Sequence, residues 1–252
     1  MLLKLKNVKK NYKINKNEVQ EVLKDINLTL KSGEFVCIYG ESGSGKSTLL
    51  YTVSGMDKAT CGKIVFDGVN ITNLKQDKLA DIRLNEMGFI FQQMYMMKNL
   101  TVLDNIALPS IRSKKEKISR KEKIKKAEDL MRKLDIIKIA DNDINEVSGG
   151  QLQRACICRS MINNPKIIFA DEPTGSLNRT SSLEVMEELV KLNQEGTTIM
   201  MVTHDPKIAA KCSRVLYIID GNIQGELDLK VSDAENDERE RKLNNWLMKL
   251  GW

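Results

Sequence analysis

The sequence predicts an α/β protein with a mainly parallel sheet, an antiparallel β region near the N-terminus and an inserted helical region. Three observations support this expectation. Short apolar runs such as residues 34–39 and 166–170 alternate with helical patterns, and apolar strands between helices are typical of a parallel sheet covered on both faces. Segments of strict apolar–polar alternation come first in the chain. A long stretch with helical periodicity then separates the two α/β parts.

Composition indicates a folded chain of one large domain or two small ones. Its 252 residues, 41% of them hydrophobic, can bury a sizeable core. The net charge is +6, from 40 Lys and Arg against 34 Asp and Glu, and much of the excess lies in residues 112–126. We expect this basic run to be a solvated helix face, although such a run can also contact phosphates or an anionic membrane surface.

Neither the cysteines nor the first residues indicate secretion. The five cysteines contain no CxxC pair and no zinc-ligand spacing, so we expect buried or incidental thiols in a reducing compartment. Residues 1–13 are too polar for a signal peptide, and no run approaches the ~20 apolar residues of a membrane span. We therefore expect a cytosolic chain whose membrane role comes through a partner.

The first part of the chain is predicted to be rich in strands. Alternation at residues 3–6 and 26–30, and the run 63–66 before a turn, predict antiparallel strands. The apolar strand at 34–39 leads into a glycine-rich loop and then a helix from about Thr48. Residues 101–163 have helical periodicity, and Ser119 with Glu122 predicts a capping box at one helix start.

Strands and helices alternate again in the last third of the chain. We expect a strand at 166–170, a helix at 183–192 ended by Gly196, a strand at 198–202, a short helix at 206–211 and a strand at 215–219. The tail is charged from about residue 232. It then ends on an amphipathic stripe of Trp246, Leu247, Leu250 and Trp252, and whether this stripe packs on its own chain or on a partner is left open.

A phosphate-binding loop follows the first buried strand. Gly40, Gly45, Lys46 and Ser47 fit the pattern G-x-x-x-x-G-K-[ST]. The glycines let backbone N–H groups turn towards phosphates, the helix N-terminus adds its dipole, Lys46 reaches the β and γ oxygens, and Ser47 ligates Mg²⁺. The residues expected to bind the nucleotide here are Gly40, Glu41, Ser42, Gly43, Ser44, Gly45, Lys46, Ser47 and Thr48.

This loop predicts a P-loop NTPase (RecA-like) core rather than a dinucleotide fold, because Thr48 stands where G-x-G-x-x-G needs its last glycine. A second strand then supplies carboxylates. Residues 167–170 are apolar and place Asp171 at the strand end, where it would act on Mg²⁺, while Glu172 would polarise the attacking water.

A second anion site is predicted shortly before that strand. Ser148, Gly149, Gly150 and Gln151 combine an N-cap box with bare backbone amides and a helix dipole. Because the P-loop already holds the phosphates of one nucleotide, this second site makes sense if it serves a nucleotide bound to another copy of the chain.

Together these motifs, in this order, resemble those of the ATP-binding cassette ATPases over residues 2–228. Residues 147–151 are similar to the family's signature motif, with Asp171 and Glu172 as the Walker B pair. Gln92 resembles the Q-loop glutamine, Tyr12 the aromatic that stacks on adenine, and His204, the one histidine, the switch histidine. Residues 176–178 resemble the D-loop, except that Asn178 replaces the usual aspartate. The amide keeps an acceptor but loses the charge, so Asn178 is left outside the catalytic set.

The resemblance implies a mechanism and an assembly. Lys46, Gln92, Glu172 and His204 would be catalytic, and Ser47, Gln92 and Asp171 would hold Mg²⁺. Two chains would close head to tail on two ATP molecules. The nucleotide-binding domain would span residues 1–228, with a helical subdomain inserted at about 93–162 and a tail at 229–252. A groove beside the Q-loop would receive a helix of a membrane permease, which would place the chain on the inner face of the cell membrane.

Two functional classes remain open at this point. Residues 88–109 and 171–175 are similar to the subgroup for lipoprotein release, macrolide export and bacitracin-type peptide resistance. Abundant Lys, Ile and Asn hint at an AT-rich genome and favour peptide resistance, with a lipid-linked substrate as the alternative. The other class is a soluble cassette ATPase that acts on nucleic acid or ribosomes. The basic run supports it, but the lack of a coiled-coil insert, zinc module or second cassette opposes it, so we expect no nucleic-acid partner.

Overall fold

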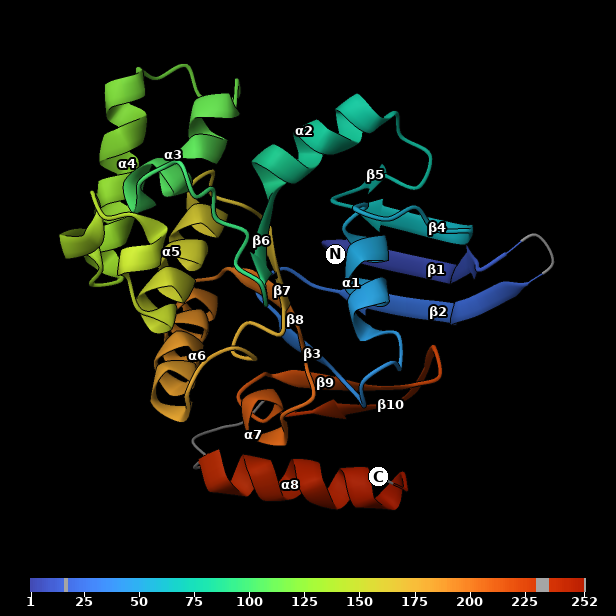
Figure 1. The fold of residues 1–252 in the computed structure, drawn as a ribbon. Helices are drawn as coiled ribbons and strands as arrows, with labels where there is room; N and C mark the ends of the chain where they lie inside the picture. The colour runs from blue at the N-terminus through green and yellow to red at the C-terminus, as the bar shows by residue number, and fades with distance from the viewer. Residues whose placement is uncertain (16–17, 230–235, 252) are drawn as a thin grey trace. The chain divides into compact units, whose positions relative to one another are not determined.

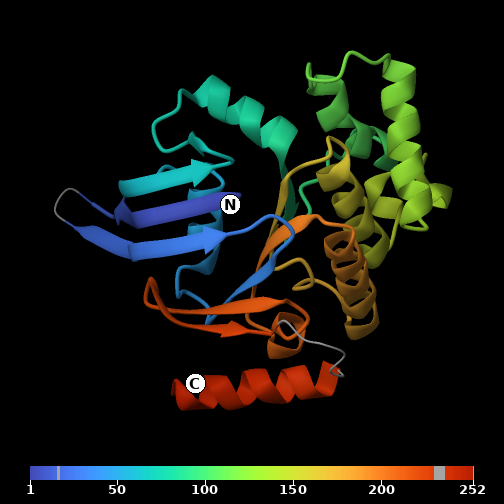
Figure 2. The same cartoon turned by 180° about the vertical axis from the view of Figure 1, so that it is seen from behind.

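The computed structural model describes residues 1–15, 18–229 and 236–251. Its internal contacts divide the chain into two compact units, which are described separately below. Unit 1 comprises Met1–Leu79 and Thr198–Trp252, and unit 2 comprises Ala80–Thr197. Figures 1 and 2 show the ribbon from opposite sides.

An antiparallel sheet with the strand order β2-β1-β4-β5 forms the first part of unit 1 (Figure 1). Its strands are β1 (Leu3–Lys13), β2 (Val19–Leu30), β4 (Cys61–Phe66) and β5 (Val69–Asn70). Leu3 pairs with Leu30 on one side and Phe66 on the other, and all three are buried. The antiparallel strands predicted from alternation are therefore confirmed, and β1 and β2 extend beyond the expected bounds.

The remaining strands of unit 1 are mainly parallel. They are β3 (Phe35–Tyr39), β8 (Thr198–Thr203), β9 (Arg214–Ile219) and β10 (Asn222–Asp228). β3 lies between β8 and β9 and runs parallel to both, whereas β10 pairs with β9 in the antiparallel direction. β3 and β8 are buried at every position, as expected of strands covered on both faces. α1 (Lys46–Val53) follows the loop after β3, and α7 (Pro206–Ala209) follows β8.

The C-terminal helix α8 (Asn236–Lys249) lies alongside β10 in both views (Figures 1 and 2). Leu243 and Leu247 are fully buried, and Trp246 is half-buried. The predicted stripe is thus shifted, because Leu243 belongs to it while Leu250 lies beyond the helix end and is exposed. Trp252, the last residue of the predicted stripe, lies outside the described residues.

Ring and hydrogen-bond contacts hold α8 against the rest of unit 1. The rings of Trp246 and Tyr217 meet edge to face, with centroids 6.3 Å apart. Gly225 makes room for the indole, since a Cβ at that position would lie 2.9 Å from Trp246 Cζ2. Arg239 Nη2 donates a hydrogen bond to Cys212 O at 2.6 Å. The tail therefore packs on its own chain.

Unit 2 combines a parallel strand pair with a group of helices. β6 (Met87–Phe91) and β7 (Ile167–Asp171) pair in parallel. The helices are α3 (Val102–Arg112), α4 (Arg120–Lys133), α5 (Gly149–Met161) and α6 (Arg179–Gln194), with short 3₁₀ turns at Ile137–Ile139 and Ile144–Glu146. α5 contacts α3, α4, α6 and β6. α2 (Gln76–Glu86), which the sequence did not predict, spans the boundary between the units.

Both predicted capping boxes of the helical region are confirmed. Ser119 Oγ accepts from the backbone N–H of Glu122 at 3.2 Å, and the Glu122 carboxylate accepts from the Ser119 N–H at 2.7 Å. Ser148 and Gln151 exchange the equivalent bonds at 3.3 and 3.0 Å. The limits of the inserted helical subdomain, at about 93–162, stay a prediction, because unit 2 also contains β6, β7 and α6.

All five cysteines lie in the described residues, and none forms a disulfide. Cys37, Cys156, Cys158 and Cys212 are buried, whereas Cys61 on β4 is exposed. Burial raises the pKa of the Cys156 thiol to about 11 and that of the Cys158 thiol to about 12. The expected buried character therefore holds for every cysteine except Cys61.

Candidate nucleotide-binding site

The loop between β3 and α1 has the form of a phosphate cradle. Gly40 has no room for a side chain, because a Cβ there would lie 2.4 Å from Ile218 O and 2.9 Å from Ser44 Oγ. Gly45, directly before α1, has a φ of 99°, in the left-handed region that glycine favours. The backbone N–H of Gly221 donates to Ser44 O at 3.0 Å and braces the loop. Bare backbone and the α1 N-terminus are therefore available to an anion.

The Lys46 side chain lies along this loop rather than in solvent. Its ammonium donates a hydrogen bond to Glu41 O at 2.6 Å, and only 7% of the residue is exposed. A charge this well covered requires polar partners. The loop carbonyl provides one, and a phosphate oxygen would provide a stronger one. Ser47 and Thr48 follow in the first turn of α1.

His204 lies beside the start of the same loop. β3 and β8 are parallel neighbours with Tyr39 opposite Thr203, so the next residues, Gly40 and His204, leave the sheet at the same edge. An open cleft of about 490 Å³ is lined by Tyr39, Gly40, Glu41, Ser42 and His204. The next residue, Asp205, begins α7 as its N-cap and accepts from the Lys207 N–H at 2.8 Å. The imidazole is therefore held at the carboxyl edge of the sheet, where ligands of open α/β sheets bind.

Tyr12 lies near the end of β1, with its hydroxyl directed at Asp57. Tyr12 Oη donates to Asp57 Oδ2 at 2.5 Å, and the Lys10 ammonium lies 4.5 Å from the ring centroid. Burial, followed by the hydrogen bond and negative charge of Asp57, raises the pKa of Tyr12 to about 12, and a hydrogen bond with the Thr48 side chain opposes this shift. The phenol is therefore protonated at neutral pH.

In unit 2, the predicted Walker B carboxylates lie beside the predicted Q-loop glutamine. Phe91 of β6 pairs with Asp171 of β7, so Gln92 and Glu172 follow at the same edge. Asp171 is buried, and Glu172 has a φ of 46° that turns the chain sharply after the strand. A Cβ on Gly175 would lie 3.0 Å from Gln92 Nε2, so the Gln92 amide lies against the turn that follows Glu172.

The predicted signature segment is an exposed helix start in unit 2. Ser148 and Gly149 are exposed at the N-terminus of α5. Gly150 is pressed against α6, since a Cβ there would lie 2.9 Å from Ser181 Oγ. An exposed N-terminus with bare amides can receive an anion from another molecule.

Asn178 has a structural role that the sequence analysis missed. Its side-chain Oδ1 accepts from the Ser181 backbone N–H at 2.9 Å and caps α6. Asparagine and aspartate are both favoured at this position, so the departure from the family's D-loop aspartate leaves the helix cap intact.

The predicted site residues fall into two groups by unit. Unit 1 holds Tyr12, the P-loop residues and His204, while unit 2 holds Gln92, the signature segment, Asp171 and Glu172. The predicted metal ligands belong to both units, so that ligand set remains a prediction. Lys10 and Asp57, which hold Tyr12, were not anticipated, because no local motif includes them.

A buried strand, a glycine-rich phosphate loop and a lysine at the following helix define this chain as a P-loop ATPase. It belongs to the ABC transporter family, whose model matches residues 23–175, and it is an ATPase subunit of that family. The predicted family, α/β fold and ATPase activity are thereby confirmed.

The chain is similar to two export proteins and to a solved ABC transporter cassette. It is 45% identical over 229 residues to the bacitracin export ATP-binding protein BceA of Halalkalibacterium halodurans, covering 90% of this chain and 88% of that protein. It is 40% identical over 239 residues to the macrolide export protein MacB of Campylobacter jejuni, covering 95% of this chain and 35% of that longer protein. The dimeric post-hydrolysis structure of the Methanocaldococcus jannaschii cassette MJ0796, bound to ADP and Pi, has a TM-score of 0.85 at 39% identity and covers 92% of this chain and 100% of that one.

Proposed function

We propose that this chain is the ATP-hydrolysing subunit of a bacterial exporter that confers resistance to bacitracin-type antimicrobial peptides. The cradle formed by Gly40, Gly45 and Lys46, with His204 at the same sheet edge, is the observation that supports ATP hydrolysis. The near full-length similarity to a bacitracin export ATPase supports the substrate class. A lipoprotein or other lipid-linked substrate is the alternative cargo.

The residues of the cradle and the catalytic carboxylates have complementary roles in this proposal. Lys46 exchanges its loop carbonyl for phosphate oxygens and neutralises their charge. Glu172 accepts a proton from the attacking water, and the His204 imidazole donates a hydrogen bond to the terminal phosphate. These contacts stabilise the charge that develops on the phosphoryl group during transfer.

The predicted metal ligands suit magnesium chemically. Ser47, Gln92 and Asp171 offer hydroxyl, amide and carboxylate oxygens, which are the donors that Mg²⁺ prefers. When bound, the ion would neutralise the charge of the phosphates. The residues that hold it in this proposal are those three side chains.

A second copy of the chain completes the site. The exposed cap at Ser148 and Gly149 offers backbone amides to a phosphate of the nucleotide that is held by the P-loop of the other copy. The dimeric arrangement of the MJ0796 cassette supports the same assembly.

The segment after Gln92 offers a docking surface for a membrane permease. Tyr95 and Met97 are 64% and 47% exposed, and aromatic and methionine side chains are enriched at protein interfaces. Arg159 braces the loop by donating to Met94 O at 2.6 Å and to Tyr95 O at 2.8 Å. Apolar side chains on a braced loop suit the apolar face of a partner helix.

The proposed location is the inner face of the cell membrane, reached through that permease. Within the described part of the chain, no helix has the length and apolar character needed to cross a membrane. In this proposal, the docking surface at Tyr95 and Met97 attaches the chain to the permease.

The basic run 112–126 offers reduced support for the nucleic-acid alternative, because three of its nine basic side chains have partners within unit 2. Lys115 pairs with Glu86 at 2.6 Å, and Lys126 pairs with Glu116 at 3.0 Å. Lys123 is buried and donates to Ser113 O at 3.0 Å. Ammonium groups held in this way are less available to a phosphate backbone.

Affinity purification from solubilised membranes tests the transport proposal. We expect a protein with membrane spans to co-purify with the chain and to be identified by mass spectrometry. A double variant, Tyr95→Ser with Met97→Ser, should lose most of it, while Met248→Ser, at a site on α8 that is at least as exposed, should retain it. Recovery of RNA or ribosomal proteins in place of a membrane protein would refute the transport role.

A susceptibility assay tests the substrate class. Cells that lack this chain should become more sensitive to bacitracin, and the wild-type chain should restore resistance while Glu172→Gln should not. Unchanged bacitracin sensitivity together with mislocalised lipoproteins would favour the lipid-linked alternative instead.

A further inference from the structure

Lys10, Tyr12 and Asp57 form a closed cluster at the edge of the P-loop helix. Asp57 uses both carboxylate oxygens, since Oδ1 accepts from Lys10 Nζ at 2.6 Å and Oδ2 accepts from Tyr12 Oη at 2.5 Å. Lys10 Nζ also donates to Lys58 O at 2.8 Å. Lys10 Nζ lies 4.5 Å from the centroid of the Tyr12 ring, so the two side chains lie on the same side of β1.

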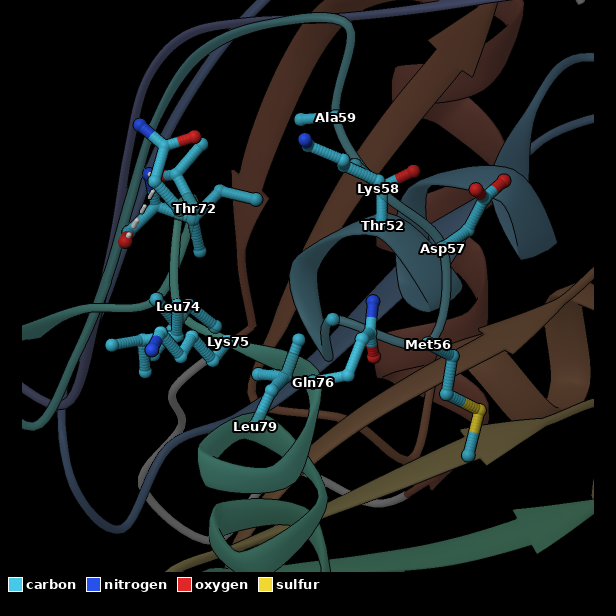
Figure 3. A pocket seen from close by; sticks show the side chains of 14 residues that line it. Thr52, Met56, Asp57, Lys58, Ala59, Thr72, Leu74, Lys75, Gln76 and Leu79 are labelled. Atoms are coloured by element: carbon cyan, nitrogen blue, oxygen red, sulfur yellow. Dashed lines mark hydrogen bonds between the residues drawn. The ribbon is translucent and has the colours of Figure 1, made fainter.

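Asp57 is tied to the helix that starts at the phosphate loop. It lies four residues beyond Val53, the last residue of α1, and its backbone N–H donates to Tyr51 O at 3.0 Å. Figure 3 shows that its carboxylate points out of the neighbouring pocket, away from Thr72 and Leu74, although its residue lines that pocket. The side chain is therefore available to β1.

Backbone bonds join the end of β1 to the same segment. The Thr60 N–H donates to Lys9 O at 2.9 Å, and the Asn11 N–H donates to Thr60 Oγ1 at 2.9 Å. The strand end and the segment after α1 are thus connected at several points.

We propose that Lys10 and Asp57 are positioning residues for the nucleotide base, because they fix the Tyr12 ring in one orientation relative to the phosphate loop. This inference rests on the proposed role of Tyr12 in stacking on adenine. Tyr12 is 39% exposed, so without these contacts its ring would rotate before the base binds. It would then lose that freedom on binding. Holding the ring in place beforehand reduces that entropic cost.

The cluster also determines how the ring can be used. Lys10 is only 7% exposed, and its ammonium covers one face of the ring as a cation–π partner. The base therefore stacks on the opposite face. The hydroxyl hydrogen is donated to Asp57, so Tyr12 contributes stacking, which every base offers, rather than a hydrogen bond that reads the base edge.

Comparison of ATP with inorganic tripolyphosphate separates base positioning from phosphate binding. Both ligands would be titrated into the full chain and into Tyr12→Phe, Asp57→Asn and Tyr12→Ala. Tyr12→Phe keeps the ring and Asp57→Asn keeps the side-chain shape, so each change weakens the contact between Tyr12 and Asp57. We expect each to weaken ATP binding about threefold to tenfold. Tyr12→Ala removes the stacking ring and should weaken it more, about tenfold or beyond. Tripolyphosphate affinity should stay unchanged throughout.

The double variant and a matched control complete the test. Tyr12→Phe combined with Asp57→Asn should weaken ATP binding no more than Asp57→Asn alone, because Asp57→Asn already disturbs the hydrogen bond that Tyr12→Phe removes. Glu21→Gln, an exposed carboxylate on the neighbouring strand β2, should have no effect.

Three outcomes would overturn the inference. Equal weakening of ATP and tripolyphosphate by Asp57→Asn would show that it distorts the phosphate loop instead. Unchanged ATP affinity in Asp57→Asn, with weakening in Tyr12→Ala, would show that the ring needs no positioning and would leave the proposed function intact. Unchanged ATP affinity in Tyr12→Ala would overturn both the inference and the proposed stacking role.

Discussion

Replacing Gly40 with alanine should weaken ATP binding strongly, for a steric reason that can be worked out from the structure. The new Cβ would lie 2.4 Å from Ile218 O and 2.9 Å from Ser44 Oγ, well inside ordinary contact distance. To relieve the first contact, the loop and β9 must separate by about 1 Å. Overpacking of this kind costs about 1–3 kcal/mol. If the loop must return to its original position to bind ATP, the same free energy lowers ATP affinity about fivefold to 150-fold.

Gly33→Ala is the matched control for this change. Gly33 lies in the turn before β3 with a φ of +79°, and a Cβ added there would have no heavy atom within 4 Å. Its substitution costs about 1–2 kcal/mol of backbone strain, so the two variants should lose similar stability. The assay combines urea unfolding with ATP titration by calorimetry. ATP affinity that stays at the wild-type level in Gly40→Ala, or falls equally in Gly33→Ala, would refute the steric argument.

Four further substitutions test the site and the C-terminal helix. Glu172→Gln cannot accept the water proton, so ATP should hold it as a dimer in gel filtration; hydrolysis at the wild-type rate would contradict this. His204→Ala should lose most phosphate release while an ATP titration stays near the wild-type curve, and an equal loss in both would argue for a binding role. Asn178→Asp keeps the cap and adds a favourable charge at the N-terminus of α6, so the free energy of unfolding should rise by up to about 1 kcal/mol. The ATPase rate should change without being abolished, and an inactive variant would show that the amide is required. Leu247→Ala should lower the free energy of unfolding by about 2–5 kcal/mol. Met248→Ala, at the exposed neighbouring residue, should lower it by about 0.5 kcal/mol or less. Equal losses in the two variants would mean that α8 is not packed on the chain.

Elements with a strong local pattern were predictable from the sequence. The buried strands β3, β7 and β8 and the capping boxes at Ser119 and Ser148 each depend on a few neighbouring residues, so their patterns are complete within one segment. α2 was missed for a physical reason. Its sequence has no apolar stripe, and Leu79 is its only buried apolar residue, so helical periodicity gives no signal there.

The same distinction between local and distant residues applies to the candidate site. The P-loop could be predicted because its residues are contiguous and lie between a strand and a helix. The contact between Lys10 and Asp57 joins positions 47 residues apart. It forms only once β1 has paired with β4 and α1 has ended nearby, so it could not be found before the fold was known.

The distribution of the cysteines makes the native chain suitable for selective labelling. Cys61 is the exposed thiol among the five, and it pairs with Lys9 on β1, the strand that carries Tyr12. Burial keeps Cys156 and Cys158 protonated and shielded, and thiols in that state react slowly with alkylating reagents. A maleimide fluorophore should therefore attach at Cys61 without any mutation and report from beside β1, the strand whose Tyr12 is proposed to contact the base.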